Sequence, residues 1–284
     1  ERALTQLRGV ELLSYEQALT GPRLSDVVHR PQQAFTPDDM ALLRLVGRRL
    51  VIGQQDLIAY HNYSYHPDVD RWRAYRRTTR LALAAADRAI FFSEHSRRDA
   101  LAEDLLPATR TEVVSVGADT PEESELDEIQ PDGVWPDRSF LLCIGADYAH
   151  KNRPFAIELT GALSELGWTG GLVFAGSHVA DGSSRERERE LLERRPDLAE
   201  RVIDLDAVDE PSKRWLYRHA RALVYPTLYE GFGLVPLEAA RAGLPCLFAP
   251  QASLVELAGQ AATLVPWNPH MGAAAGGRRR RPPR

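Results

Sequence analysis

Short apolar runs alternate along the chain with stretches in which apolar residues recur every three or four positions. The short runs have the length of buried strands, and the recurring positions have the spacing of one face of a helix. This alternation is typical of βαβ units that build parallel sheets, so we expect an α/β fold. The expected strands are residues 26–28, 50–52, 89–92, 112–116, 140–144, 172–175, 202–205, 222–225, 246–248 and 262–265. The expected helices are residues 36–45, 70–86, 154–166, 185–194, 212–218 and 235–242, with two more that begin at Ser96 and near Leu254.

An acidic, proline-bearing segment divides the chain into two parts. With 284 residues the chain is longer than a usual single domain of about 100–200 residues. Residues 120–137 have no helical or strand period, which predicts a linker. We therefore expect two Rossmann-like domains that face each other across a cleft, over residues 1–119 and 138–268. The first is expected to be incomplete, because no opening strand with a glycine-rich turn is present, and the arginine-rich residues 269–284 are expected to be disordered.

Composition and charge exclude several classes of protein. The net charge is −5 even though five of the last seven residues are arginine, so the chain is too acidic for a nucleic-acid binder. No apolar run approaches the roughly 18 residues of a membrane-spanning helix, and the first residues do not resemble a signal peptide. We expect a cytoplasmic protein, with Cys143 and Cys246 as buried thiols inside strands. The basic tail leaves open a peripheral contact with anionic lipid on the inner face of a membrane.

The strongest functional signal lies between the expected strand 222–225 and the expected helix 235–242. Gly231 and Gly233 allow the backbone to approach a ligand closely, and the free N–H groups at the start of the helix form an anion site. Glu238, one turn into the helix, can accept hydrogen bonds from vicinal hydroxyls such as those of a ribose. The alternative is an acidic helix start beside a glycine turn, but this explains only one glutamate.

This segment resembles the signature of family 4 glycosyltransferases, two glutamates separated by seven residues around a Gly-Phe-Gly loop. The resemblance covers most of residues 24–266 and is strongest over residues 140–258. It implies a retaining enzyme of the GT-B fold in which Glu238 holds the donor ribose and Glu230 contacts the transferred sugar. The amides that it assigns to the donor diphosphate are those of Gly231, Phe232, Gly233 and Leu234.

A lysine follows the first strand expected in the second domain. Lys151 precedes a helix at the edge where open α/β sheets bind ligands, and it is one of only two lysines among 35 basic residues. The resemblance implies that Lys151 binds the diphosphate. Many relatives also carry an arginine five residues earlier, where this chain has Ala146. Either His150 or Arg153 takes its place, or the diphosphate is stabilised less; a solvent-exposed Lys151 with no function is the plain alternative.

The first domain offers weaker candidates. Asp56 matches the aspartate of a His-Asp-Leu segment found after a strand in many relatives, with Gln55 in place of the histidine, so we expect Asp56 at the donor site. His61 is a candidate for the missing imidazole, against the alternative of a structural or solvated histidine. Residues 93–99 resemble the family's strand-to-helix crossing near the cleft, with the alternative that Ser96 is only a helix N-cap. Residues 29–33 stay unassigned on the acceptor side.

These features predict transfer of a sugar, with retention, from a nucleoside-diphosphate sugar to a hydroxyl of a glycan or lipid-linked acceptor. The predicted catalytic residues are Glu230, Lys151 and His61. We expect no cofactor and no metal, because the chain lacks zinc-ligand spacing and an Asp-x-Asp pair of the sort that holds a divalent metal on a nucleotide sugar. The rival hypotheses are a non-catalytic or inactive nucleotide-sugar-binding fragment and a related sugar phosphorylase or epimerase.

Overall fold

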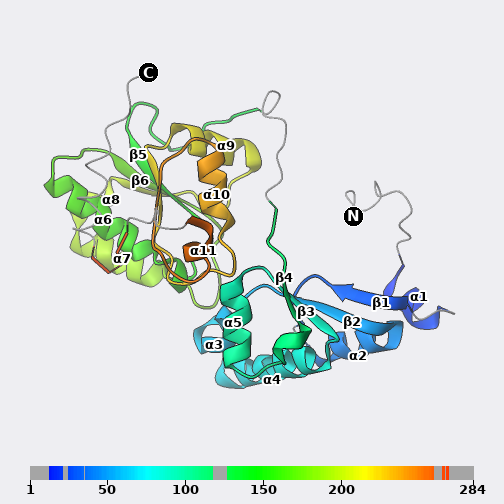
Figure 1. The fold of residues 1–284 in the computed structure, drawn as a ribbon. Coiled ribbons are helices and arrows are strands. Elements are labelled where there is room, and N and C mark those ends of the chain that lie inside the picture. The colour runs from blue at the N-terminus through cyan, green and yellow to red at the C-terminus, as the bar shows by residue number, and fades with distance from the viewer. Residues whose placement is uncertain are drawn as a thin grey trace.

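The computed structural model describes residues 13–21, 25–34, 36–117, 127–258, 264–265 and 267–268. These residues form two α/β domains, each built on its own parallel sheet (Figure 1). This confirms the predicted fold class. Parts of the predicted linker and of the strand expected over 262–265, and the whole tail 269–284, lie outside the described residues.

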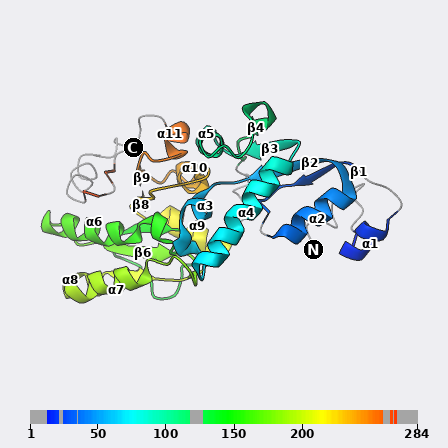
Figure 2. The same cartoon turned by 90° about the horizontal axis from the view of Figure 1, so that it is seen from below.

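The N-terminal domain carries a four-stranded parallel sheet in the order β1-β2-β3-β4. Each strand lies beside the one that precedes it, so right-handed crossovers place the connecting helices on one face. Figures 1 and 2 show α2 and α4 together on that face of the sheet. The elements are α1 (Tyr15–Thr20), β1 (Ser25–Arg30), α2 (Pro37–Val46), β2 (Gly47–Gln54), α3 (Ile58–His61), η2 (Tyr63–Tyr65), α4 (Val69–Ala85), β3 (Arg88–Phe91), α5 (Glu94–Ala102), η3 (Ala108–Arg110) and β4 (Thr111–Val113).

Helix starts in this domain follow local capping chemistry. Thr36 caps α2 with Pro37 at the first helical position, as predicted, and Asp39 completes a capping box. The start of α5 differs from the prediction. Ser93, not Ser96, is the N-cap, because Ser93 has extended backbone and its hydroxyl accepts the Ser96 N–H at 3.1 Å.

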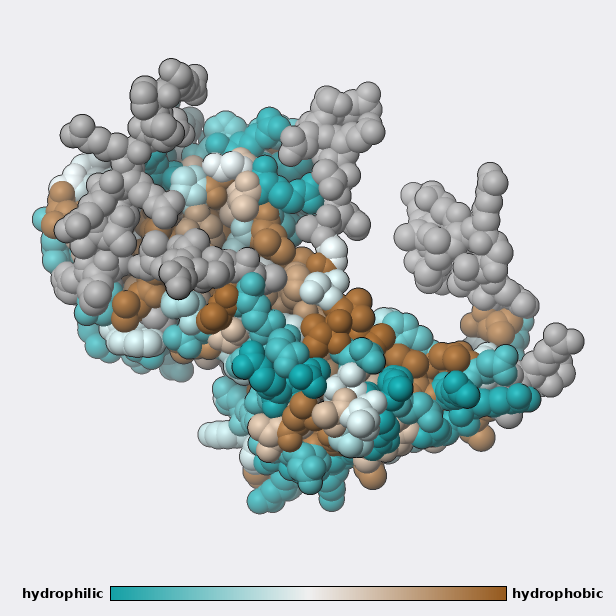
Figure 3. All heavy atoms as spheres, in the orientation of Figure 1, coloured by the Kyte–Doolittle hydropathy of each residue, from teal (hydrophilic) through white to brown (hydrophobic). Residues whose placement is uncertain are grey.

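The opposite face of this sheet is open along β1. Val28 packs against the core cluster that contains Leu50 and Ile52, whereas Val27 is 53% exposed. Neighbouring residues of a strand point to opposite faces, so the exposed valine marks the uncovered side. Figure 3 shows a band of hydrophobic residues along the upper side of this domain.

The C-terminal domain carries a five-stranded parallel sheet in the order β7-β6-β5-β8-β9. The chain first builds outward from β5 to β7 and then returns to add β8 and β9 on the other side of β5. This return creates a topological switch point between β5 and β8. The elements are β5 (Phe140–Ile144), η5 (Ala149–Lys151), α6 (Arg153–Glu165), β6 (Gly171–Ala175), α7 (Arg185–Arg194), α8 (Pro196–Ala199), β7 (Val202–Asp204), α9 (Glu210–His219), β8 (Ala222–Tyr225), α10 (Leu234–Arg241), β9 (Cys246–Phe248) and α11 (Leu254–Ala258).

Helices cover both faces of this sheet, and the central strand is buried throughout. Leu142 of β5 packs in the cluster that includes Trp215 of α9, while Cys143 packs in the cluster that includes Phe155 of α6. Burial raises the pKa of the Cys143 thiol to about 12 and that of Cys246 to about 12, so both are protonated at neutral pH. The expectation of unbonded thiols agrees with two free cysteines in the described residues.

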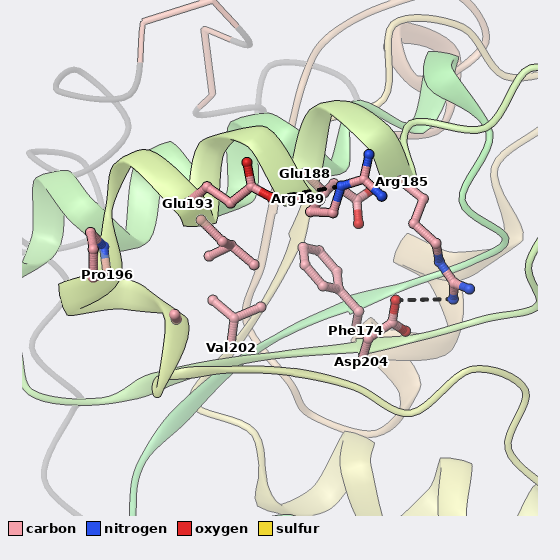
Figure 4. Close-up of a pocket in the computed structure, with 10 residues that line it drawn as sticks. Phe174, Arg185, Glu188, Arg189, Glu193, Pro196, Val202 and Asp204 are labelled. Carbon is pink, nitrogen blue, oxygen red and sulfur yellow. Dashed lines mark hydrogen bonds and ion pairs between the residues drawn. The ribbon is translucent and has the colours of Figure 1, made fainter.

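A buried arginine joins α6, α7 and β7. Arg153 is 1% exposed, and its Nη2 lies 3.1 Å from Glu188 Oε2 and 2.6 Å from Asp204 Oδ2. Burial raises the pKa of Glu188, and Arg153 opposes that shift. A cavity of about 440 Å³ lies beside this cluster, between α7 and strands β6 and β7 (Figure 4). The cluster therefore joins three elements of the fold, while Arg153 Nε and Nη1 are buried and have no hydrogen-bond partner among the described residues.

Replacement of Arg153 by alanine is expected to lower the free energy of unfolding by about 3 kcal/mol, because it leaves the buried Glu188 carboxylate without its cation and leaves Asp204 with Arg185 alone. Urea denaturation followed by circular dichroism measures this. The matched control is Arg189→Ala, an arginine of α7 that is 67% exposed and is expected to cost less than about 0.5 kcal/mol. Equal losses in the two variants would show that the buried cluster contributes nothing beyond a surface pair.

Candidate functional site

The candidate site lies where the two strands at the switch point end. The loop after β5 leads into η5, which carries Lys151, and the loop after β8 carries Glu230. Ligands of open α/β sheets bind at the carboxyl ends of strands on either side of such a point. Two predicted catalytic residues that are far apart in sequence are thus neighbours in space.

Lys151 and Glu230 form an ion pair over a buried tyrosine. Lys151 Nζ lies 2.5 Å from Glu230 Oε1 and donates to Tyr225 Oη at 3.1 Å. Tyr225 Oη in turn donates to Glu230 Oε1 at 2.6 Å, and burial together with the Glu230 carboxylate holds the pKa of Tyr225 well above 10. The lysine side chain is 18% exposed and the glutamate side chain 10% exposed. Lys151 is therefore fixed in place, not a solvated surface lysine.

The glycine loop between Glu230 and α10 has the geometry expected of an anion site. Gly233 is the N-cap of α10 with a φ of 98°, a left-handed conformation that favours glycine. No side chain caps the start of α10, so the first N–H groups, including that of Leu234, stay available to a ligand. Phe232 is 9% exposed, and its carbonyl accepts from Ser253 at 2.9 Å. Its side chain belongs to the core, which leaves only its amide for the predicted role.

Glu238 is held by two residues of α9. Lys213 Nζ donates to Glu238 Oε1 at 3.1 Å, and Tyr217 Oη donates to Oε2 at 2.7 Å. Burial and the Glu238 carboxylate raise the pKa of Tyr217. Sequence reasoning assigned Lys213 no role, although the scarcity of lysine was a usable signal. Each of the two lysines pairs with one of the two glutamates of the motif.

A cavity of about 910 Å³ opens between the two domains in front of Lys151 and Glu230. Most of its wall comes from the N-terminal domain, and the C-terminal domain closes it at the switch point. A cavity of this size accommodates a drug-sized or sugar-sized ligand. The residues that line the cavity include Asp56, Tyr65, His66, Asp68, Arg71, Tyr75, Tyr148 and His150, together with Lys151, Glu230 and Gly231.

Asp56 lies in the cavity wall opposite the glutamate. Burial raises the pKa of Asp56, and the negative charge of Glu230 raises it further, while a hydrogen bond from the Ile58 N–H opposes the shift. Asp56 therefore lines the cavity from the N-terminal side, and its contact with the donor stays a prediction. Gln33, from the segment that stayed unassigned, lines the same cavity.

Tyr65 and His150 meet across the domain boundary. Tyr65 Oη lies 2.6 Å from His150 Nδ1 and accepts the His150 backbone N–H at 3.1 Å. Burial, followed by the positive charge of Lys151, lowers the pKa of His150 from 6.5 to about 4. His150 is thus neutral at pH 7, so it contributes no charge in place of the absent arginine at position 146.

Two predicted site residues lie elsewhere. His61 does not line the cavity; its Nε2 lies 3.3 Å from Asp99 Oδ2 and its Nδ1 lies 3.8 Å from Glu103 Oε1, so it packs on α5. Arg153 is 1% exposed and lies in its cluster with Glu188 and Asp204. Neither His61 nor Arg153 lines the interdomain cavity, and the roles predicted for them in catalysis and in donor binding stay predictions.

The loop of the motif also forms the domain contact. Ser93 Oγ and Ser96 Oγ donate to the Gly231 carbonyl at 2.7 and 3.3 Å. Any Cβ on Gly231 would lie 2.6 Å from the Gln55 carbonyl oxygen, so only glycine fits. Glu256 accepts the N–H groups of Glu94 and His95 at 2.9 and 2.6 Å. The predicted place of Ser96 near the cleft agrees with this contact.

The sequence contains two Asp-x-Asp stretches, at residues 68–70 and 204–206, and the structure shows what their carboxylates contact. Asp204 and Asp206 pair with Arg185, and Asp70 pairs with Arg73 while Asp68 caps α4. Within the described ranges, no three His, Cys, Asp or Glu side chains come together in a way that would hold a metal ion. None of the described helices has the length and apolar content needed to span a membrane.

The pKa of His150 predicts a pH dependence of stability. The unfolded chain takes up a proton near pH 6.5 but the folded chain only near pH 4, so stability falls as the pH drops through this window. Compared with His150→Gln, the free energy of unfolding of the parent is expected to fall by about 2–3 kcal/mol between pH 7 and pH 4. Denaturant titrations at a series of pH values measure this. Parallel curves for the two proteins would contradict a neutral His150.

Three comparisons with known proteins agree with this geometry. Residues 138–276 match the family model described as Glycosyl transferases group 1. The alpha-1,3/1,6-mannosyltransferase ALG2 of Dictyostelium discoideum is 31% identical over 125 residues, which are 39% of this chain and 29% of that protein. The chain thus spans less than a third of this curated relative.

Solved structures share the fold at low sequence identity. Sucrose-phosphate synthase of Thermosynechococcus elongatus has a TM-score of 0.67 and 18% identity, over 89% of this chain and 64% of that one. Anabaena HepE in complex with UDP and glucose has a TM-score of 0.64 and 18% identity, over 88% of this chain and 67% of that one. The chain therefore shares the two-domain GT-B architecture of these structures, and its residues 138–276 match the family model of the glycosyl transferases group 1.

Proposed function

We propose that this chain moves a sugar, with retention, from a nucleoside-diphosphate sugar to a hydroxyl of a glycan or lipid-linked acceptor, as in polysaccharide biosynthesis. The observation that carries the proposal is the Lys151–Glu230 pair, which faces an interdomain cavity at the switch point. The reaction is proposed to need no metal and no cofactor and to take place in the cytoplasm. A peripheral contact of the basic tail with the membrane stays open.

Lys151 is the group best placed to stabilise the departing diphosphate. An ammonium has three N–H donors, and here one points to Glu230 and one to Tyr225. The third is free for a phosphate oxygen, and its charge opposes the negative charge that develops as the sugar leaves. Glu230 is proposed to keep Lys151 in this position while it contacts the transferred sugar.

The remainder of the donor is proposed to lie along the glycine loop and α10. The N–H groups of residues 231–234 and the positive end of the helix suit a diphosphate. Glu238 suits the ribose, with Lys213 and Tyr217 as the residues that orient its two oxygens. Anabaena HepE is described in complex with UDP and glucose, which supports a uridine donor as the first to test.

A second candidate is a nucleotide-sugar-binding protein without transfer activity. The observation that favours it is Ala146, since neither the neutral His150 nor the buried Arg153 supplies the cation that many relatives have there. Both candidates predict donor binding, and only the first predicts turnover. The two experiments below separate them.

Nucleotide binding is expected to raise thermal stability. In a panel of UDP, GDP, ADP and their sugar conjugates, the cognate nucleotide at about 100 times its dissociation constant should add about 2.7 kcal/mol. The gain should disappear in Glu238→Ala, because the ribose loses its acceptor, and should persist in Glu210→Ala, a 71% exposed glutamate that also lies near Lys213. A parent that no nucleotide stabilises would refute the donor site. If the nucleotide stabilises Glu238→Ala as much as the parent, Glu238 does not bind the ribose.

Turnover is expected to depend on the two lysines in different ways. Lys151→Met should lower kcat by about 10²–10³-fold, because the charge is used mainly when the diphosphate leaves. Lys213→Met should raise the KM for the donor with a smaller change in kcat, because it orients the ribose glutamate. A coupled assay of nucleotide release, run with an acceptor present, measures kcat and the KM for the donor in both variants. The reverse assignment of kcat and KM effects would contradict the proposed roles.

A further inference from the structure

The cavity wall contributed by the N-terminal domain carries a cation that pairs with no other side chain in the part of the chain that the structure describes. Arg71 is exposed, lies in the first turn of α4 and lines the cavity. Among the described residues its guanidinium has no ion pair and no hydrogen bond. An arginine in this position presents parallel N–H donors that match a phosphate or carboxylate.

The other cationic side chains around the cavity are already engaged. Lys151 is paired with Glu230, and His150 is bonded to Tyr65 and neutral at pH 7. His66 donates from Nε2 to the Ala59 carbonyl at 3.0 Å. Within the described part of the cavity wall, Arg71 is therefore the cationic side chain that has neither an ion pair nor a side-chain hydrogen bond. It lies on the N-terminal domain, away from the switch point where the donor diphosphate is proposed to bind.

The other arginines of α4 differ from Arg71 in a way that helps a test. Arg73 pairs with Asp70 at 3.3 Å, and Arg76 and Arg80 pair with Glu103 at 3.5 and 3.3 Å. Arg77 is exposed on the same helix but does not line the cavity. It matches Arg71 in charge and helix context and differs only in position.

The neighbours of Arg71 suit a sugar better than a bare anion. Asp68 also lines the cavity, and its Oδ1 accepts the N–H groups of Asp70 and Arg71 at 2.9 and 2.8 Å, which leaves Oδ2 for a hydroxyl. Aromatic rings from both domains form the adjoining wall. Tyr65 and Tyr148 have ring centroids 5.1 Å apart, and such rings offer apolar faces to the C–H side of a sugar.

We propose that the acceptor is a sugar derivative that carries a negatively charged group, a phosphate or carboxylate, which Arg71 binds at the N-terminal wall of the cavity. This rests on the proposed function, because it takes the cavity to be the acceptor site. Arg71 and the aromatic rings hold the sugar, and the carboxylate of Asp68 disfavours a small anion without hydroxyls. The same chemistry is present in a soluble sugar phosphate and in a phosphoinositide headgroup.

The test is a calorimetric titration of the full chain, with and without UDP or GDP, against four kinds of probe. These are hexose 1- and 6-phosphates, glucuronate, neutral hexoses and inorganic phosphate. At least one anionic sugar is expected to bind about tenfold more tightly than its neutral counterpart and than inorganic phosphate. Arg71→Gln should weaken that binding about tenfold, Arg71→Lys should weaken it less, and Arg77→Gln should leave it as in the parent.

Sedimentation with vesicles of phosphatidylinositol in phosphatidylcholine separates the two sources of the anion. Binding to these vesicles that Arg71→Gln removes and Arg77→Gln keeps would assign the acceptor to a lipid headgroup, whereas binding of hexose phosphates alone would assign it to a soluble sugar. The proposal is overturned if anionic and neutral sugars bind alike, if no probe binds at about 10 mM, or if Arg71→Gln binds as the parent does.

The nucleotide titrations on the same samples keep the two proposals apart. Nucleotide binding without Arg71-dependent anion binding leaves the proposed function standing and removes this acceptor site. Arg71-dependent anion binding without any nucleotide binding leaves the anion site standing and removes the proposed function.

Discussion

The ion pair between Lys151 and Glu230 is the interaction on which the rest of the site depends. Both side chains are largely withdrawn from water, and a pair of this kind is stable only where further hydrogen bonds compensate for lost solvation. Tyr225 provides that compensation from within the sheet. The pair can form only because β5 and β8 are adjacent, so the order β7-β6-β5-β8-β9 is what brings residues 79 positions apart into contact.

The same loop that carries Glu230 also joins the domains, which links the donor site to the shape of the cavity. The Gly231 carbonyl accepts from Ser93 and Ser96, and the backbone at Gln55 leaves no space for a side chain at position 231. Glu256 holds the start of α5 from the other domain. A ligand that moves the glycine loop must therefore disturb the domain contact, so the proposed donor binding would be coupled to the domain position through these hydrogen bonds.

Sequence periodicity predicted most of the fold, because strands such as Phe140–Ile144 and helices such as Arg185–Arg194 carry their own pattern. Sequence periodicity did not predict the short elements, because the helical turns that place Tyr65 span only three or four residues, too few to show a period. The motifs singled out Lys151 and Glu230 separately, and only the strand order shows that they are neighbours at one edge of the sheet. Arg153 is close to Lys151 in sequence, but the start of α6 places its side chain in the core. The partners of Glu238 come from a separate helix, and only the packing of α9 on α10 reveals them.

The charges of the candidate site nearly cancel, and this restricts how it can bind a diphosphate. Lys151 is balanced by Glu230, Lys213 is balanced by Glu238, and His150 is neutral at pH 7. A donor diphosphate therefore meets little net positive charge, and the attraction must come from directed donors, namely the remaining N–H of Lys151 and the free amides at the start of α10. Directed donors act only at the correct geometry. They favour a leaving group in one position over an anion anywhere in the cleft, which is the preference that catalysis by electrostatic preorganisation requires.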